Sequence, residues 1–248
     1  AAVFDVPGFN YRPHRYQESY SKLPQRLILG SETASTVSSR GVYKFPVERK
    51  AMAKYPDHQA SSYDVEHCNW SNLPEDDFIQ HEDLPYCIGE FVWTGFDYIG
   101  EPTPWNGTTA GDSGRGAIPN SSYFGIVETT GFPKDTYYLY RAQWNKADTT
   151  VHLVTAWDSA NQYVSGGKTP VWVYTNAAKV ELYLNDSLIG TTNRTVNTTD
   201  AGHVYYTYAP TSNNTSVCTA QAGYNADSLY SVFNVAYTAG TLTAKAYD

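Results

Sequence analysis

The first part of the chain alternates apolar runs with polar stretches. Runs of apolar and aromatic residues at 3–11, 27–32 and 87–99 predict three buried strands, because near-continuous hydrophobicity is typical of strands covered on both faces. The polar stretch between the last two, residues 47–83, is long enough for a crossover helix and an elaborated loop. Residues 135–145 predict a helix with a half-buried aromatic face. This pattern indicates an α/β arrangement.

The pattern changes near residue 148, where short and mostly alternating runs begin. Gly, Asn, Asp and Ser separate these runs roughly every 8–12 residues, which is typical of an antiparallel sandwich. Asn185-Asp186 predicts a hairpin turn, whereas Asn, Ser and Thr dominate 191–199 and 211–216 and predict loops. We therefore expect two domains, which meet near residue 147. The strands expected in the second are 151–157, 170–175, 180–184, 204–209, 216–222 and 229–236.

Composition narrows the classes of partner. The formal net charge of −8 argues against nucleic acid or an anionic membrane as the main partner, and there is no apolar run of about 18 residues that could span a membrane. Aromatic residues make up 15% of the 248 residues, with 22 Tyr and 6 Trp. Such amphipathic rings suit sugar sites, although tyrosine-rich β-domains share this composition. Sequons at 69–71 and 106–108 slightly favour a secreted or extracytoplasmic location.

Cysteine and acid–histidine spacings predict no metal and no cofactor. Cys68, Cys87 and Cys218 lack the Cys-x-x-Cys spacing of metal sites, and an odd count cannot pair completely. Cys68 and Cys87 could pair, but nothing in the sequence demands it. Four further candidates match no ligand pattern and fit a solvated loop better; they are Asp64, Glu66, His67 and His81.

Glu32 is the strongest candidate for chemistry. The apolar run that ends at Leu29 stops at Gly30, and Glu32 follows among small hydroxyl residues. In parallel α/β barrels, catalytic groups lie at the C-terminal ends of the strands, so Glu32 is a candidate catalytic carboxylate. The alternative is a solvent-facing acid near a helix N-terminus, where a carboxylate is unremarkable.

Several motifs resemble glycoside hydrolase family 2, and the β-galactosidase branch of that family in particular. They are GFNYR at 8–12, GSETAS at 30–35, GEFVWTGFDYIGEPTP at 89–104, SYFGIV at 122–127 and GFPKD at 131–135. In the second part, VWVYTN at 171–176 and VELYLN at 180–185 resemble the immunoglobulin-like domain that follows the barrel in that branch. The resemblance covers nearly the whole chain.

The resemblance implies a fold. Residues 1–147 would be the C-terminal part of a (β/α)8 TIM barrel, with 3–11 as its sixth strand, 27–32 as its seventh and 88–99 as its eighth. Residues 148–248 would be an immunoglobulin-like β-sandwich, complete or truncated. The fold class expected is thus α/β plus all-β. Because three barrel strands leave exposed edges, we expect the chain to associate with the missing N-terminal part of the same enzyme or with a second copy of itself.

The resemblance also implies site residues. Family members place a nucleophile at the end of the seventh strand, which corresponds to Glu32, and Tyr11 would be the phenol that orients it. Trp93 would be a stacking platform for the sugar, although core packing is the plainer interpretation of an aromatic residue inside an apolar strand. Asp97 and Glu101 would bind substrate hydroxyls, or equally serve as structural turn acids. Lys134 and Asp135 are interpreted as the start of a helix.

The chain also departs from the family pattern. Some β-galactosidases carry a histidine where this chain has Ser35, and an asparagine where it has Phe124, which puts the sodium and galactose 6-hydroxyl contacts in doubt. Asn145-Lys146 is not the Asn-x-Lys motif of the β-glucuronidase branch, so that branch is less favoured. The acid/base of the family lies in an Asn-Glu pair, and this sequence has no such dipeptide.

The function we expect is therefore that of a fragment of a retaining, exo-acting β-galactosidase that carries the nucleophile, lacks the acid/base and is inactive alone. Its substrate would be a terminal β-galactoside or an oligosaccharide that ends in one. Two alternatives stay open: a non-catalytic carbohydrate-binding or interaction module, and another specificity within the family, such as β-glucuronidase or β-mannosidase.

Overall fold

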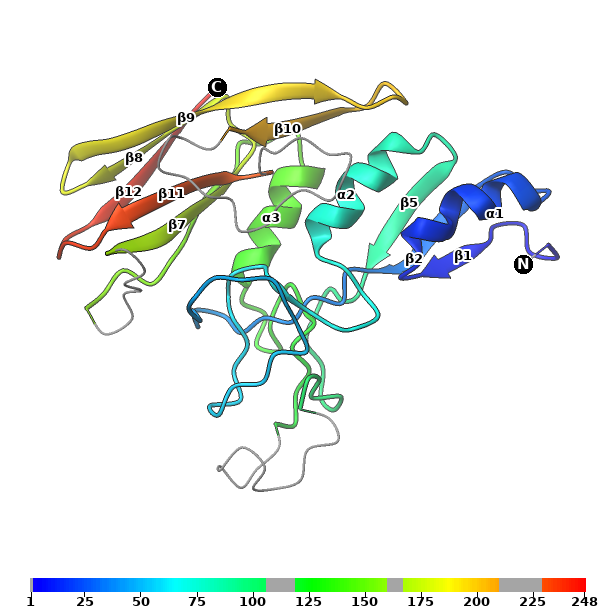
Figure 1. The fold of residues 1–248 in the computed structure, drawn as a ribbon, viewed down its shortest axis with the longest axis horizontal. Helices are drawn as coiled ribbons and strands as arrows, with labels where there is room; N and C mark the ends of the chain where they lie inside the picture. Colours follow the sequence, from blue (N-terminus) through cyan, green and yellow to red (C-terminus); the bar gives the residue numbers. More distant parts are fainter. Residues whose placement is uncertain (1, 106–118, 160–166, 210–228) are drawn as a thin grey trace.

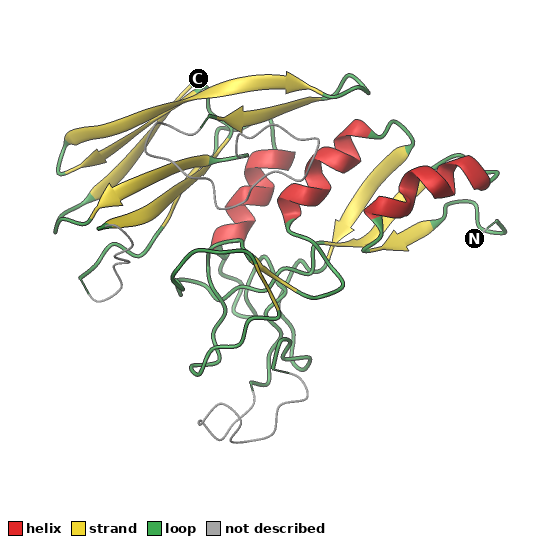
Figure 2. Ribbon diagram, in the orientation of Figure 1, coloured by secondary structure: helices red, strands yellow, loops and turns green. Residues whose placement is uncertain are grey.

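The chain is mostly β-structure with few helices. A computed structural model describes residues 2–105, 119–159, 167–209 and 229–248 (Figure 1). In this part of the chain, one three-stranded parallel sheet and two antiparallel sheets account for nearly all the strands, and three α-helices accompany them (Figure 2). No helix within the described residues is long and apolar enough to cross a membrane.

The parallel sheet consists of β1 (Gly8–Asn10), β2 (Ile28–Thr33) and β5 (Cys87–Val92), in the order β1-β2-β5. A short 3-10 turn (Pro13–Arg15) and α1 (Tyr16–Lys22) connect β1 to β2, and α2 (Pro74–Asp83) precedes β5. The expected crossover helix between the second and third strands is thus confirmed as α2. Both connections join parallel strands, which need a crossover rather than a hairpin.

The backbone of β2 lies close to the side chains that cover it. A Cβ atom on Gly30 would come within 2.8 Å of His81 Nε2 on α2 and 3.1 Å of the Tyr16 hydroxyl on α1. The Tyr16 hydroxyl and His81 Nε2 lie 3.1 Å apart in a buried hydrogen bond. Gly30 therefore allows both helices to meet beneath the strand, and a larger residue would push them away.

Two of the strand predictions were too long. Residues 3–6 lie outside β1, and Val3 is 89% exposed because nothing in the described chain packs on it. The third strand ends at Val92, and residues 93–99 instead make isolated bridges, Phe96 with Val127 and Ile99 with Ser121. Nor is β5 covered on both faces, since Ile88 and Phe91 are 58% and 64% exposed.

The segment between β2 and α2 is largely irregular. Its only regular pairing among the described residues is the two-residue parallel bridge of β3 (Lys50–Ala51) with β4 (Glu66–His67). Cys68 begins the stretch that follows β4, and its N–H donates to Ser35 O at 3.0 Å. This contact ties the stretch back to the end of β2.

Two antiparallel sheets form the second part of the fold. One has the order β10-β9-β8-β12 and the other β11-β7-β6. Their strands are β6 (Val151–Val154), β7 (Lys168–Thr175), β8 (Lys179–Leu184), β9 (Ser187–Thr198), β10 (Val204–Tyr208), β11 (Ser231–Ala236) and β12 (Leu242–Tyr247).

The hairpin prediction is confirmed, and one loop prediction is wrong. Asn185 and Asp186 take left-handed φ values of 48° and 64° between β8 and β9, as a type I′ turn requires. Residues 191–199 were expected to be a loop, but β9 runs through Thr198. Its threonines are β-branched and suit a pleated surface, and Thr192 is buried at 2% exposure. The expected strand 216–222 and loop 211–216 lie outside the described residues.

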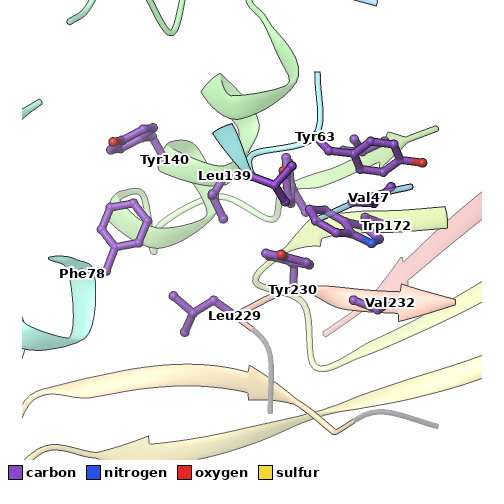
Figure 3. Packing of buried hydrophobic residues seen from close by; sticks show 12 residues of the cluster. Val47, Tyr63, Phe78, Leu139, Tyr140, Trp172, Leu229, Tyr230 and Val232 are labelled. Atoms are coloured by element: carbon purple, nitrogen blue, oxygen red, sulfur yellow. The ribbon is translucent and has the colours of Figure 1, made fainter. Parts of the chain in front are cut away.

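Strand β7 is buried on both faces. Val171 and Val173 pack with Val180 and Leu182 between the two antiparallel sheets. On the other face, Trp172 packs with Leu139 of α3 (Asp135–Trp144), and Figure 3 shows the aromatic residues that surround them. The helix expected at 135–145 is thus confirmed. Because this core joins α3 to the sandwich, packing continues across residue 147, and the domain boundary there stays a prediction.

Candidate functional site

Glu32 lies at the C-terminal end of β2 with a strand on each side. Asn10 of β1 pairs with Glu32, and the Tyr11 N–H donates to Glu32 O at 2.9 Å. Tyr11 and Ala34 both take left-handed φ values, 52° and 46°. The chain therefore turns sharply just beyond both strand ends, and Glu32 is left half-buried between the two turns.

The side chain of Tyr11 lies between Glu32 and Ser35. Its hydroxyl is 2.6 Å from Ser35 Oγ. The pKa of the Tyr11 phenol is raised, chiefly by burial; the hydrogen bond with Ser35 opposes the rise, whereas a hydrogen bond to Glu32 and the charge of that carboxylate add to it. The phenol is therefore neutral at ordinary pH. The two residues that were expected to act together are in contact.

Trp93 lies immediately after β5, at the end of the strand that neighbours β2. Its N–H donates to Thr33 O at 2.9 Å, and the peptide bond from Trp93 to Thr94 is cis. The ring is half-buried and packs against a cluster that includes Cys68 and Trp105. One portion of the ring is therefore core and the rest is accessible, and the sugar platform stays a prediction.

Glu101 joins the Trp93 side of the site through Tyr98. The Tyr98 ring packs edge-on against Trp93 with centroids 5.9 Å apart, and its hydroxyl donates to Glu101 Oε2. Glu101 is exposed and has a φ of 47°. Burial and Glu101 raise the pKa of Tyr98. Sequence reasoning gave Tyr98 no role, although its place between Trp93 and Glu101 in one motif could have indicated one.

Asp97 does not fit the substrate-binding role that was expected for it. Its side chain is only 8% exposed, and Asp97 Oδ2 lies 2.6 Å from Lys134 Nζ. Its other oxygen accepts hydrogen bonds from the Gly125 N–H at 2.7 Å and from the Ser122 hydroxyl at 3.1 Å. The carboxylate is therefore engaged within the protein, which favours the structural turn acid of the two interpretations left open.

Lys134 and Asp135 do more than begin α3. Lys134 is buried, and its ammonium also donates to Ser38 O at 2.8 Å and Tyr123 O at 3.2 Å. Asp135 accepts hydrogen bonds from Tyr43 and pairs with His152 of β6 at 2.6 Å. These contacts fix the loops around the site to α3 and to the sandwich.

A second set of polar groups is buried beneath β2, on the side of the helices. Thr33 Oγ1 donates to Glu90 Oε2 at 2.8 Å, and His81 Nδ1 lies 3.5 Å from the same oxygen. Burial raises the pKa of Glu90 to about 7 and that of Asp77 to about 8, and it lowers the pKa of His81 to about 4. These groups underlie the strand that carries Glu32, and only His81 among them was singled out from the sequence, as a possible metal ligand.

The residues that were considered as metal ligands are buried rather than part of a solvated loop. Glu66 accepts from the Tyr55 hydroxyl at 2.6 Å, whereas His81 is occupied with α1 and α2. In the described ranges, no group of three or more His, Cys, Asp or Glu side chains could hold a metal ion. Cys68 and Cys87 are free thiols, and Cys218 lies outside the described residues.

Known proteins resemble this chain over most of its length. A family model described as "Domain of unknown function (DUF4982)" matches residues 166–248. A β-galactosidase of Bacteroides ovatus, BoGH2A, is 34% identical over 194 residues, which are 75% of this chain and 21% of that protein. A β-glucuronidase of Formosa agariphila is 37% identical over 67 residues, 27% of this chain and 6% of that protein.

The fold has a solved counterpart. The crystal structure of a β-glycosidase from Bacteroides vulgatus superimposes with a TM-score of 0.67 at 20% identity, over 98% of this chain and 29% of that chain. The chain belongs to glycoside hydrolase family 2, and it spans about a fifth (21%) of the length of the curated β-galactosidase that it matches.

Proposed function

We propose that this chain carries the nucleophile of a retaining β-glycosidase, and that Glu32 is that nucleophile. The observation that supports this most directly is the contact of Glu32 with Tyr11 at the shared C-terminal ends of two parallel strands. A retaining enzyme needs an ionised carboxylate to attack the anomeric carbon. A phenol that donates a hydrogen bond to the carboxylate favours the ionised form.

The remaining site residues take roles around the sugar. The accessible part of Trp93 forms an apolar wall on which a sugar face stacks, and Glu101, held by Tyr98, accepts hydrogen bonds from hydroxyl groups. The second carboxyl of the reaction, which protonates the leaving group, comes from a part of the protein outside this sequence. Without that acid/base, we expect the chain to be inactive alone.

The same proposal assigns the parallel sheet to a (β/α)8 barrel. In the described chain, β1 and β5 each have one neighbour, and Phe91 on β5 is 64% exposed. Such open edges and an apolar side chain on the sheet fit strands that continue pairing with further barrel strands. The chain would thus associate with the remaining part of the same enzyme, and the antiparallel sheets would form the immunoglobulin-like sandwich that follows.

The substrate we propose is a terminal β-galactoside. This rests on the 34% identity to a β-galactosidase over 75% of the chain. A β-glucuronoside is the second candidate, because a relative named a β-glucuronidase matches a shorter segment at 37% identity. The β-glucuronidase branch is characterised by an Asn-x-Lys motif, and this chain has Asn145-Lys146 instead. Asn145 lies just after α3, and its amide donates to Asp148 at 3.0 Å. The β-galactoside is therefore the favoured substrate.

The test is hydrolysis of aryl β-galactoside, β-glucuronide and β-mannoside by the full-length enzyme and its Glu32→Gln variant. We expect turnover of the galactoside to fall by several orders of magnitude in the variant. The reason is that an amide cannot replace the carboxylate that attacks the sugar and forms the covalent intermediate. Glu18→Gln on the exposed face of α1 is the matched control and should leave the rate unchanged. Sugar binding without turnover in the wild type would favour the non-catalytic module instead.

A further inference from the structure

Ser35 is buried against the phenol that contacts Glu32. Its exposed fraction is 1%, and its Oγ lies 2.6 Å from the Tyr11 hydroxyl oxygen. A buried hydroxyl this close to a second hydroxyl forms a short hydrogen bond.

Either oxygen of the Ser35–Tyr11 pair can be the donor by distance alone. A tyrosine hydroxyl has one proton, and an ionised carboxylate can only accept. When Tyr11 gives its proton to Glu32, the Tyr11 oxygen is left to accept from Ser35. The influences on the Tyr11 pKa are consistent with this order, since Ser35 lowers that pKa and Glu32 raises it.

Ser35 is itself held in place by the stretch after β4. Its carbonyl oxygen accepts from the Cys68 N–H at 3.0 Å and from the Ser71 hydroxyl at 3.1 Å. Ala34 before it takes a φ of 46°, which turns the chain back towards Tyr11. The serine hydroxyl is thus presented from a rigid turn rather than from a mobile loop.

We propose that Ser35 is a positioning residue for the nucleophile: its hydroxyl donates to Tyr11 and thereby orients the Tyr11 phenol towards Glu32. The inference rests on the proposed function of Glu32. Hydrogen bonds in such a chain polarise one another, so a donor to Tyr11 strengthens the bond that Tyr11 makes to Glu32. Ser35 acts through Tyr11 and does not itself contact the sugar.

The first readout is the titration of Tyr11 in the full-length enzyme. Difluorotyrosine incorporated at position 11 reports its own ionisation by fluorine NMR, and fluorination brings the phenol pKa into an accessible range. The other titratable groups that face this phenol are Glu32 from β2 and the Cys68 thiol from the stretch after β4, and both raise its pKa. In Ser35→Ala we expect the Tyr11 pKa to rise further, because a donor to the phenolate is lost.

The sign of the change in the Tyr11 pKa distinguishes a positioning role of Ser35 from a space-filling one. If Ser35 only filled space, its removal would admit water and bring the Tyr11 pKa down towards the value of an exposed tyrosine. Ser35→Thr keeps the hydroxyl and should restore the wild-type pKa. A fall in the Tyr11 pKa of Ser35→Ala, or no change, would overturn the proposal.

Kinetics give the second readout. We expect kcat to fall about tenfold in Ser35→Ala with little change in KM, because one hydrogen bond to the nucleophile pair is lost. Ser231→Ala is the matched control, since Ser231 also makes a buried 2.6 Å hydroxyl–hydroxyl contact, with Thr192 in the sandwich. If Glu32→Gln retained activity, the proposed function would fail, whereas the Tyr11 titration would still decide the role of Ser35.

Discussion

Lys134 Nζ lies 2.6 Å from Asp97 Oδ2, with both side chains almost fully buried. The pair joins the loop after β5 to the start of α3 and so fixes the segment between Trp93 and Glu101. Burial lowers the pKa of Lys134, and the charge of Asp97 opposes that fall. Removing the lysine would leave a buried carboxylate without its counter-ion.

Lys134→Met should therefore destabilise the chain by about 3–5 kcal/mol, as expected when one partner of a buried ion pair is removed. Urea denaturation followed by circular dichroism measures the change. The pair of Lys22 and Glu18 on α1 has the same 2.6 Å separation but side chains 70% and 50% exposed, so Lys22→Met should have a much smaller effect. Equal effects of the two substitutions would contradict this account.

Asp77 should make stability fall as pH rises towards 8. Its pKa is raised to about 8, first by burial and then by the charge of Glu90, whereas an unfolded aspartate titrates near pH 4. The stabilisation that comes from the proton on Asp77 is fully present below about pH 4, and it is lost as pH rises through about 8. The slope is at most about 1.4 kcal/mol per pH unit.

Asp77→Asn removes that dependence, because the amide does not titrate. Between pH 6.5 and 8.5, its free energy of unfolding should fall less than that of the wild type. His81, whose pKa is lowered to about 4, makes stability rise with pH instead of fall. That effect is confined to pH values below its unfolded pKa near 6.5. Asp186→Asn in the β8–β9 turn is the control, and a wild-type slope in Asp77→Asn would refute the assignment.

Gly125 should not tolerate a side chain. A Cβ atom there would lie 2.1 Å from the Asp97 backbone nitrogen and 2.5 Å from Val127 O. Backbone atoms cannot move aside cheaply, so Gly125→Ala should cost about 3 kcal/mol or abolish folding. A Cβ on Gly95 would meet no atom within 4 Å, and Gly95→Ala should be nearly neutral. Thermal unfolding of both variants, compared with the wild type, makes the test.

The sequence predicted what depends on local chemistry. The turn at Asn185 and Asp186 follows from residues that accept a left-handed φ. The apolar run before Gly30 likewise predicted a strand there, which the structure has as β2 (Ile28–Thr33), with Glu32 near its C-terminal end. The role of Asp97 was left open because its partner Lys134 lies on a different segment, which no local pattern indicates. Strand β9 was missed because its Thr and Asn resemble a loop until their pairing with β8 and β10 is known.

The central claim is that Glu32 attacks the sugar and forms a covalent bond with it. An activated 2-deoxy-2-fluoro-β-galactoside traps such an intermediate in a retaining enzyme, and trypsin then releases the peptide 27–40, in which Glu32 is the only acidic side chain. Mass spectrometry of the labelled full-length enzyme should find the fluorosugar on this peptide, and on no peptide of Glu32→Gln. A label on another peptide, or a label that persists in Glu32→Gln, would contradict the account.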